Sequence, residues 1–230
     1  MAEERDFERA WLSKFSACLD EVAGEQLKNE VMEGSEGLSS RSSRQEVIHW
    51  SRRAMERLDA QVEEEKRKAI LTGCACQYPK SDLQAMRKAY EATGDAALAH
   101  RMLREQFEAF LKDALALSAE LVEEIVRRGW GAAGVMKGHT IIATKIPKSG
   151  NLVEYMKESD PEKKRRLYCH CPRIRAVLES SETLSPTYCY CGAGFYKGIW
   201  EEILKAPVEV EVLASVLGGD EVCTVAIRFQ

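Results

Sequence analysis

The chain has 230 residues, enough for one large domain or two modest ones. Its 45% hydrophobic and 30% charged residues are typical of a soluble globular protein. A formal net charge of -4 excludes an overall basic field that would attract nucleic acid or an anionic membrane. No apolar run approaches the roughly 20 residues that span a bilayer, and the start MAEERDFERAW lacks the apolar segment of a signal peptide. We therefore expect a cytoplasmic protein that neither binds nucleic acid nor spans a membrane.

The first part of the chain predicts helices. Residues 4–33 place apolar side chains, from Phe7 onward, three and four positions apart, as in an amphipathic helix. The Gly/Ser-rich segment 34–43 predicts a linker. Ser43 and Glu46 then form a capping box that opens a long helix, which we expect to end at Gly73 in a left-handed conformation.

Further helices are expected after the loop GCACQYP. Ser81 and Gln84 suggest a second capping box, which would open a helix over residues 82–92. Apolar periodicity predicts two more helices, at 95–116 and 118–128.

The pattern changes to mixed elements beyond residue 128. A β-branched run and turn signals predict the following elements in order: a strand at 139–146, a short helix at 151–158, a strand at 166–171, a helix from Pro172 to Leu178 and a helix at 194–205.

The C-terminal residues predict a β-hairpin. Apolar and polar residues alternate over 208–217 and again over 223–229, on either side of the turn Gly218-Gly219-Asp220. The predicted fold class is α+β, with a helical N-terminal half followed by a small antiparallel sheet. We expect a helical region at 1–128 and a metal- and ligand-binding region at 129–230, packed as one globular unit.

Eight cysteines in a cytoplasmic chain favour metal binding or catalysis over disulfides. Six of them form three Cys-X-Cys pairs, and two stand alone on predicted apolar faces. The pairs are Cys74/Cys76, Cys169/Cys171 and Cys189/Cys191, and the single residues are Cys18 and Cys223.

The second and third pairs together supply the four sulfurs of a tetrahedral zinc site. In an extended chain, residues i and i+2 point to the same side, so Cys169 and Cys171 could share one ion, and Cys189 and Cys191 could complete the site. Zinc is preferred as the cofactor, and an iron–sulfur cluster is the second choice.

Other roles for these residues stay open. The first pair could add Cys74 and Cys76 to the same site, form a second site or supply a reactive thiol. His170 is an alternative ligand or an acid–base group. A redox dithiol competes with metal binding, because a disulfide within Cys-X-Cys would be strained and oxidising.

The C-terminal part also resembles known families. The runs YCYCGAGFYKGIWEEIL and PVEVEVLASVLGGDEVCTVAIRF resemble the end of 4-vinyl reductase-type ligand-binding domains. These domains share a fold with the nitric-oxide-signalling and Golgi-transport ligand-binding modules. CHCPRIR with CYCGAGFYKGIWE is still more similar to an uncharacterised prokaryotic family allied to the L-2-amino-thiazoline-4-carboxylate hydrolase-like proteins. The resemblance covers about a third of the chain.

The resemblance implies a small hydrophobic or carboxylate ligand with a cysteine-bound metal nearby, and it carries over no catalytic residue. The leading hypothesis is therefore a cytoplasmic zinc-binding, small-ligand-binding protein. One alternative is a metal- or thiol-dependent hydrolase of a small cyclic C–N or C–S substrate, and another is a redox or metal-responsive interaction protein. The amphipathic N-terminal helices suggest a homodimer.

Overall fold

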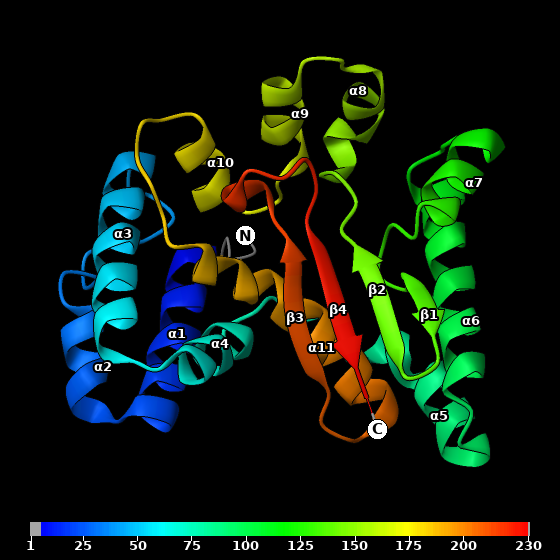
Figure 1. Ribbon diagram of the computed structural model, residues 1–230, viewed down its shortest axis with the longest axis horizontal. Coiled ribbons are helices and arrows are strands. Elements are labelled where there is room, and N and C mark those ends of the chain that lie inside the picture. The colour runs from blue at the N-terminus through cyan, green and yellow to red at the C-terminus, as the bar shows by residue number, and fades with distance from the viewer. Residues whose placement is uncertain (1–5, 230) are drawn as a thin grey trace, which may run out of the picture. The chain divides into compact units, whose positions relative to one another are not determined.

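A computed structural model describes residues 6–229 of the chain (Figure 1), so the predicted helix start at residue 4 lies outside the described residues. Internal contacts divide the chain into two units. A helical unit consists of Met1–Cys76 and His170–Gly194, and a sheet unit consists of Gln77–Cys169 and Phe195–Gln230. The predicted regions 1–128 and 129–230 differ from these units, although the described strands all lie in the second region. Their packing as one globular unit stays a prediction. Within the described part of the chain, none of the helices combines the length and apolarity needed to cross a membrane.

The helical unit is built from α-helices and one short 3₁₀ turn. In chain order these are α1 (Phe7–Ala23), α2 (Glu25–Met32), α3 (Arg44–Gln61), α4 (Glu64–Gly73), α10 (Pro172–Leu178), η4 (Pro186–Cys189) and the first residues of α11 (Tyr190–Leu204).

The core of this unit follows the predicted apolar stripe. Phe15 and Leu19 of α1 are fully buried, and the Phe15 ring meets the edge of Trp50 with ring centroids 6.4 Å apart. Such an aromatic pair adds about 1 kcal/mol beyond the area it buries. Phe7 departs from the prediction, because it is 75% exposed at the start of α1.

Two predicted helices are each divided in the structure. The chain breaks between α1 and α2 at Gly24, whose φ of 87° suits glycine. It breaks again after α3, where Val62 is extended. The capping box of Ser43 and Glu46 is confirmed at the start of α3.

A helix ends at Gly73 as expected, because Gly73 is the last residue of α4, but this glycine does not adopt the predicted left-handed conformation. Its need for glycine comes from packing instead. A Cβ at this position would lie 2.6 Å from Cys18 Sγ, so α1 and α4 approach closely here because no side chain intervenes.

The sheet unit holds the strands and the remaining helices. Its elements are η1 (Lys80–Leu83), α5 (Gln84–Thr93), α6 (Ala96–Ala109), the π-helical turn η2 (Phe110–Ala114), α7 (Ala119–Arg127), β1 (Val135–Lys137), β2 (Thr140–Thr144), η3 (Ser149–Asn151), α8 (Leu152–Lys157), α9 (Pro161–Tyr168), the rest of α11, β3 (Glu209–Ala214), η5 (Val216–Gly218) and β4 (Thr224–Arg228).

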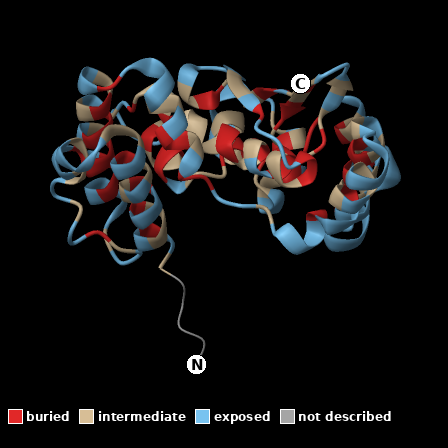
Figure 2. Cartoon of the chain, turned by 90° about the horizontal axis from the view of Figure 1, so that it is seen from below, coloured by how far each residue is buried: buried red, intermediate tan, exposed pale blue. Residues whose placement is uncertain are grey.

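The four strands form an antiparallel sheet in the order β1-β2-β4-β3. Ile227 of the central strand β4 pairs with Ile141 on one side and Val210 on the other. The predicted α+β class and the C-terminal hairpin of β3 and β4 are thus confirmed. Helix α11 runs along β3 and β4 (Figure 1), where Trp200 stacks on Phe229 at 5.9 Å between ring centroids. Val225, Ala226 and Ile227 of β4 are buried, and Figure 2 colours the buried residues of the chain red.

Two predictions in this unit were wrong. Residues 166–171 were expected to form a strand, but helix α9 continues to Tyr168. The Asp160 carboxylate accepts the backbone N–H of Lys163, and Pro161 occupies the first turn. This N-cap and this proline stabilise a helix that begins at residue 161. The expected capping box at Ser81 does not form either, since the Ser81 hydroxyl donates to Asp82 within η1. The short strand β1 lies in the glycine-rich stretch, which had no strand signal.

Candidate functional site

The structure divides the predicted four-sulfur set between the two units. Cys171, Cys189 and Cys191 belong to the helical unit and are half-buried, whereas Cys169 belongs to the sheet unit and is buried at the end of α9. Cys171 is the N-cap of α10, and Cys189 ends η4. Whether all four sulfurs meet at one ion stays a prediction.

The expected extended geometry holds for one pair and is wrong for the other. Cys169 and Cys171 both have extended backbones, as predicted. Cys189 and Cys191 lie in helical turns, because η4 runs directly into α11. Residues two apart on a helix point about 200° apart, so these two side chains leave the backbone in nearly opposite directions.

Cys191 has a different partner, Cys74 at the end of α4. The interaction with Cys191, followed by burial and by the charges of Cys191 and Cys18, raises the pKa of Cys74 well above its usual value. Cys74 is fully buried, and its Sγ lies 3.2 Å from the Leu71 carbonyl, so its one S–H can donate either to that carbonyl or to Cys191. The indole N–H of Trp11 donates to Cys191 Sγ over 3.5 Å, which favours negative charge on that sulfur.

Cys171 joins the same neighbourhood from the start of α10. Burial raises the pKa of its thiol and the charge of Cys191 adds to the rise, while hydrogen bonds from the backbone N–H of Ile174, the Tyr188 hydroxyl and the N–H of Arg173 act in the opposite direction. Its Sγ lies 3.8 Å from the Tyr188 hydroxyl oxygen. Burial raises the pKa of Tyr188, and the charges of Cys171, Cys191 and Cys74 add to the rise, so all three thiols lie in the neighbourhood of this hydroxyl.

A buried ion pair borders these thiols. The Arg173 guanidinium bonds to the Glu8 carboxylate, and these side chains are 7% and 9% exposed. The same guanidinium donates to the Tyr188 hydroxyl over 3.2 Å and lies 4.0 Å from the centre of the Trp11 ring. The Glu8 carboxylate balances the Arg173 charge, so the pair is neutral overall, but its guanidinium is the part that contacts Tyr188 and Trp11.

The sequence prediction gave Glu8 and Trp11 no part in a site. One signal was available: Glu8 continues the buried stripe of Leu12 and Phe15 at helical spacing. A carboxylate on an apolar face needs a buried cation, and the basic run after Cys171 could have supplied it.

The remaining predicted residues lie at the margins. Cys18 of α1 is half-buried, and burial, followed by the charge of Glu21, raises its pKa. Cys76 is exposed, and His170 is half-buried in the connection between α9 and α10. Cys223 lies in the sheet unit just before β4, half-buried rather than in the core.

As the side chains stand, no group of three or more His, Cys, Asp or Glu residues among residues 6–229 is arranged to hold a metal ion. The three thiols near Tyr188 are the right type of donor for a soft cation, but their sulfur atoms would have to turn toward a common point.

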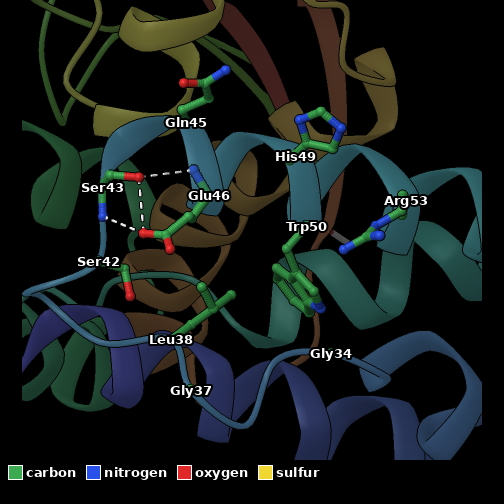
Figure 3. A pocket seen from close by; sticks show the side chains of 10 residues that line it. All are labelled: Gly34, Gly37, Leu38, Ser42, Ser43, Gln45, Glu46, His49, Trp50 and Arg53. Atoms are coloured by element: carbon green, nitrogen blue, oxygen red, sulfur yellow. Dashed lines mark hydrogen bonds between the residues drawn. The ribbon is translucent and has the colours of Figure 1, made fainter.

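The helical unit also contains a pocket of about 510 Å³ between the linker and the start of α3 (Figure 3). Buried Leu38 and Trp50 give it apolar surface. Figure 3 shows the Glu46 carboxylate turned toward Ser43, with the hydrogen bonds of the capping box. The lining residues are Gly34, Gly37, Leu38, Ser42, Ser43, Gln45, Glu46, His49, Trp50 and Arg53.

Comparison with known proteins gives one match. Residues 143–230 are similar to a family of unknown function, DUF6144. The match covers less than half of the chain and includes Cys169, Cys171, Cys189 and Cys191. No curated protein and no solved structure matches the chain.

Proposed function

We propose that this chain is a cytoplasmic zinc-binding protein whose helical unit holds the ion through Cys74, Cys171 and Cys191. The observation that carries the proposal is the interaction between Cys74 and Cys191, together with the electrostatic interaction between Cys191 and Cys171. Three segments far apart in the sequence bring their thiols together in one unit. Buried thiols near one another are unfavourable as thiolates unless a cation joins them.

The surroundings fit a soft divalent cation. Three thiolates and one Zn²⁺ carry a net charge of -1, and the Arg173 guanidinium would turn its donors toward this charge although Glu8 balances its own charge. Zinc sites with three protein ligands keep one position for water or a substrate, whereas a fourth thiolate closes the site. Cys18 and Cys189 are the other thiols of this unit's interior and are candidates for the fourth ligand.

Metal analysis of protein purified without oxygen tests this proposal. We expect one zinc per chain, and we expect Cys74→Ala, Cys171→Ala and Cys191→Ala each to lower the bound zinc at least tenfold. Cys76→Ser is the matched control, because Cys76 belongs to the same loop as Cys74 but is exposed. Cobalt substitution gives a second reading, since thiolate ligands produce intense charge-transfer bands. Wild-type protein without metal after zinc supplementation would refute the proposal.

An enzymatic role is the second candidate. The resemblance of residues 169–229 to the L-2-amino-thiazoline-4-carboxylate hydrolase-like and 4-vinyl reductase-type proteins supports it, and the family match covers the same segment. An open zinc position would polarise a small C–N or C–S substrate. Turnover of a cyclic thio-amidine that is lost in Cys171→Ala but kept in Cys76→Ser would favour this role. Absence of turnover in zinc-loaded protein would favour a structural metal.

The pocket of Figure 3 is our proposed site for a small anionic ligand. Its volume lies within the roughly 300–1,000 Å³ of small-molecule sites. Among the described residues no carboxylate pairs with Arg53, whereas its neighbours Arg52 and Arg57 pair with Glu56 and Glu33.

Benzoate is a suitable probe for this pocket, because its ring can lie on Trp50 and its carboxylate can reach Arg53. We expect benzoate to change tryptophan fluorescence at millimolar concentration in the wild type. Arg53→Ala should abolish the change and Arg44→Ala, outside the pocket lining, should keep it. An equal response in both variants would refute the site. Light scattering of the same protein tests the predicted homodimer.

A further inference from the structure

The backbones that carry Cys74 and Cys191 approach each other unusually closely. A Cβ on Gly194 would lie 2.1 Å from the Thr72 carbonyl oxygen and 2.8 Å from Ala75 Cβ. Gly194 therefore lets the first turn of α11 pack directly on residues 72–75. Cys191 lies three residues before Gly194 on the same face of α11, and Cys74 lies within the segment that this face contacts. Disulfide formation requires such an approach, with Cα atoms within about 7 Å.

We propose that Cys74 and Cys191 are a redox pair that closes to a disulfide on reaction with a hydroperoxide. The pair is not a Cys-X-Cys motif, so its ring does not carry the strain of such a short loop. The two thiols also lie close enough to act directly on each other, since the interaction with Cys191 is the largest cause of the raised pKa of Cys74.

The chemistry assigns different roles to the two sulfurs. Cys191 is half-buried and accepts the Trp11 indole N–H, so it is the sulfur that a hydroperoxide can reach. Cys191 releases its thiol proton to solvent, and its thiolate attacks the hydroxyl oxygen of the hydroperoxide. The O–O bond breaks, the alkoxide takes up a proton from solvent and leaves as the alcohol, and Cys191 becomes a sulfenic acid. The Cys74 thiol then attacks this sulfur, the S–O bond breaks, and water leaves. The two thiols lose two electrons in total, and the hydroperoxide gains them.

Burial explains why Cys74 is the second reactant. Its side chain is fully buried, and its thiol can donate to the Leu71 carbonyl, so a peroxide in solvent does not meet it first. Its proton passes to the leaving hydroxide in the second step. The exposed Cys76 has access to peroxide but no paired sulfur of this kind, which makes it a control for unspecific oxidation.

Oxidation would also remove two of the three proposed zinc ligands. This consequence rests on the proposed function, whereas the disulfide itself does not. A hydroperoxide would thus release zinc from the helical unit with the same stoichiometry as it forms disulfide.

Peptide mapping of the wild-type protein after treatment with hydrogen peroxide tests the inference directly. After remaining thiols are alkylated, we expect one cross-linked peptide pair that joins Cys74 to Cys191. In Cys74→Ser, Cys191 should accumulate as a sulfenic acid that a dimedone-type probe traps. In Cys191→Ser, the reaction of Cys74 should slow at least tenfold, and Cys76→Ser should behave as the wild type. Circular dichroism checks that each variant is folded.

The outcomes separate the two proposals. A Cys74–Cys191 disulfide in protein that never binds zinc would refute the metal proposal and support the redox pair. Two results together would overturn the redox pair. Peroxide would release no zinc from zinc-loaded protein, and in metal-free protein it would join other cysteines or none. A chromogenic chelator follows zinc release during the same reaction.

Discussion

Two buried polar side chains of the sheet unit, Tyr168 and His100, bond to the backbone, whereas the buried Glu8 and Arg173 of the helical unit bond to each other. The Tyr168 hydroxyl accepts the backbone N–H of Cys223 over 2.8 Å and bonds to the Lys145 carbonyl. His100 lies 3.2 Å from the Gly134 carbonyl through Nε2. These contacts hold loops against the sheet, so their role is structural.

The helical unit uses its buried polar groups differently. Glu8 and Arg173 satisfy each other, and Cys74 and Cys191 interact directly. Side-chain networks of this kind are costly to bury and can change state through metal binding or oxidation. The proposed chemistry therefore lies in the helical unit, which takes Cys171 and Cys191 from the predicted metal- and ligand-binding region 129–230 and Cys74 from outside it.

Among the variants that test this difference between the units, removal of the Glu8 carboxylate should change the free energy of unfolding most. Glu8→Gln leaves the buried Arg173 charge without its partner, and we expect a loss of about 4 kcal/mol in the free energy of unfolding. Urea denaturation followed by circular dichroism measures it. Glu21→Gln, on the exposed face of the same helix, should change the free energy by less than about 0.5 kcal/mol. Equal effects would mean that the ion pair is not essential to the helical unit.

Gly194→Ala should cause the second-largest loss in the free energy of unfolding. The new methyl group would collide with the Thr72 backbone, which cannot move aside as a side chain can, and we expect a loss of about 3 kcal/mol. Peroxide should then no longer join Cys74 to Cys191.

Gly192→Ala is the matched control in the same helix, because a Cβ there meets no atom within 4 Å. It should stabilise the protein by about 0.5 kcal/mol, since alanine favours helix. If both variants behave alike, the close approach of α11 to residues 72–75 is not a requirement of the fold.

Tyr168→Phe tests the sheet unit in the same way. Without the hydroxyl, the N–H of Cys223 and the carbonyl of Lys145 lose a buried partner, at a cost of about 2 kcal/mol. Zinc content should not change. Tyr78→Phe, which loses a half-buried hydrogen bond to Gln106, should cost less than about 1 kcal/mol. A loss of zinc in Tyr168→Phe would contradict the separation of structural and chemical roles between the units.

Local signals made much of the fold predictable. The capping box at Ser43, the proline at residue 172 and the alternation after residue 207 each act within a few residues, and each predicted its element correctly. The breaks at Gly24 and Val62 were missed because the apolar periodicity continues across them. Gly24 was itself a local stop signal that the prediction passed over, whereas at Val62 tertiary packing decides whether the helix continues.

The candidate site was less predictable, for a related reason. Spacing indicated that Cys171 and Cys191 matter, but it paired each with its neighbour in sequence. The structure pairs Cys191 with Cys74 because Gly194 allows α11 to approach the end of α4. A contact between distant segments depends on the shapes of both segments, whereas a sequence motif describes only one of them. Glu8 could have been predicted from the sequence, since a carboxylate in a buried apolar stripe implies a buried cation nearby.

The smallest expected effect is a pH dependence that should belong to the sheet unit alone. Burial lowers the pKa of His100 from its ordinary value of 6.5, against hydrogen bonds to the Gly134 and Ala133 backbones that raise it. The folded state therefore favours neutral imidazole. Above pH 6.5 the imidazole is neutral in both the folded and the unfolded state, and its contribution is complete.

As the pH falls below 6.5, the unfolded chain binds the proton first, so stability must decrease. The slope from this one residue cannot exceed about 1.4 kcal/mol per pH unit. Urea denaturation between pH 7 and pH 5 measures it, and His100→Gln, which keeps a donor toward Gly134, should flatten the curve. The variant should bind as much zinc as the wild type at pH 7. If His100→Gln instead lowers zinc content, the imidazole serves the thiol site, and the division between a structural sheet unit and a chemical helical unit fails.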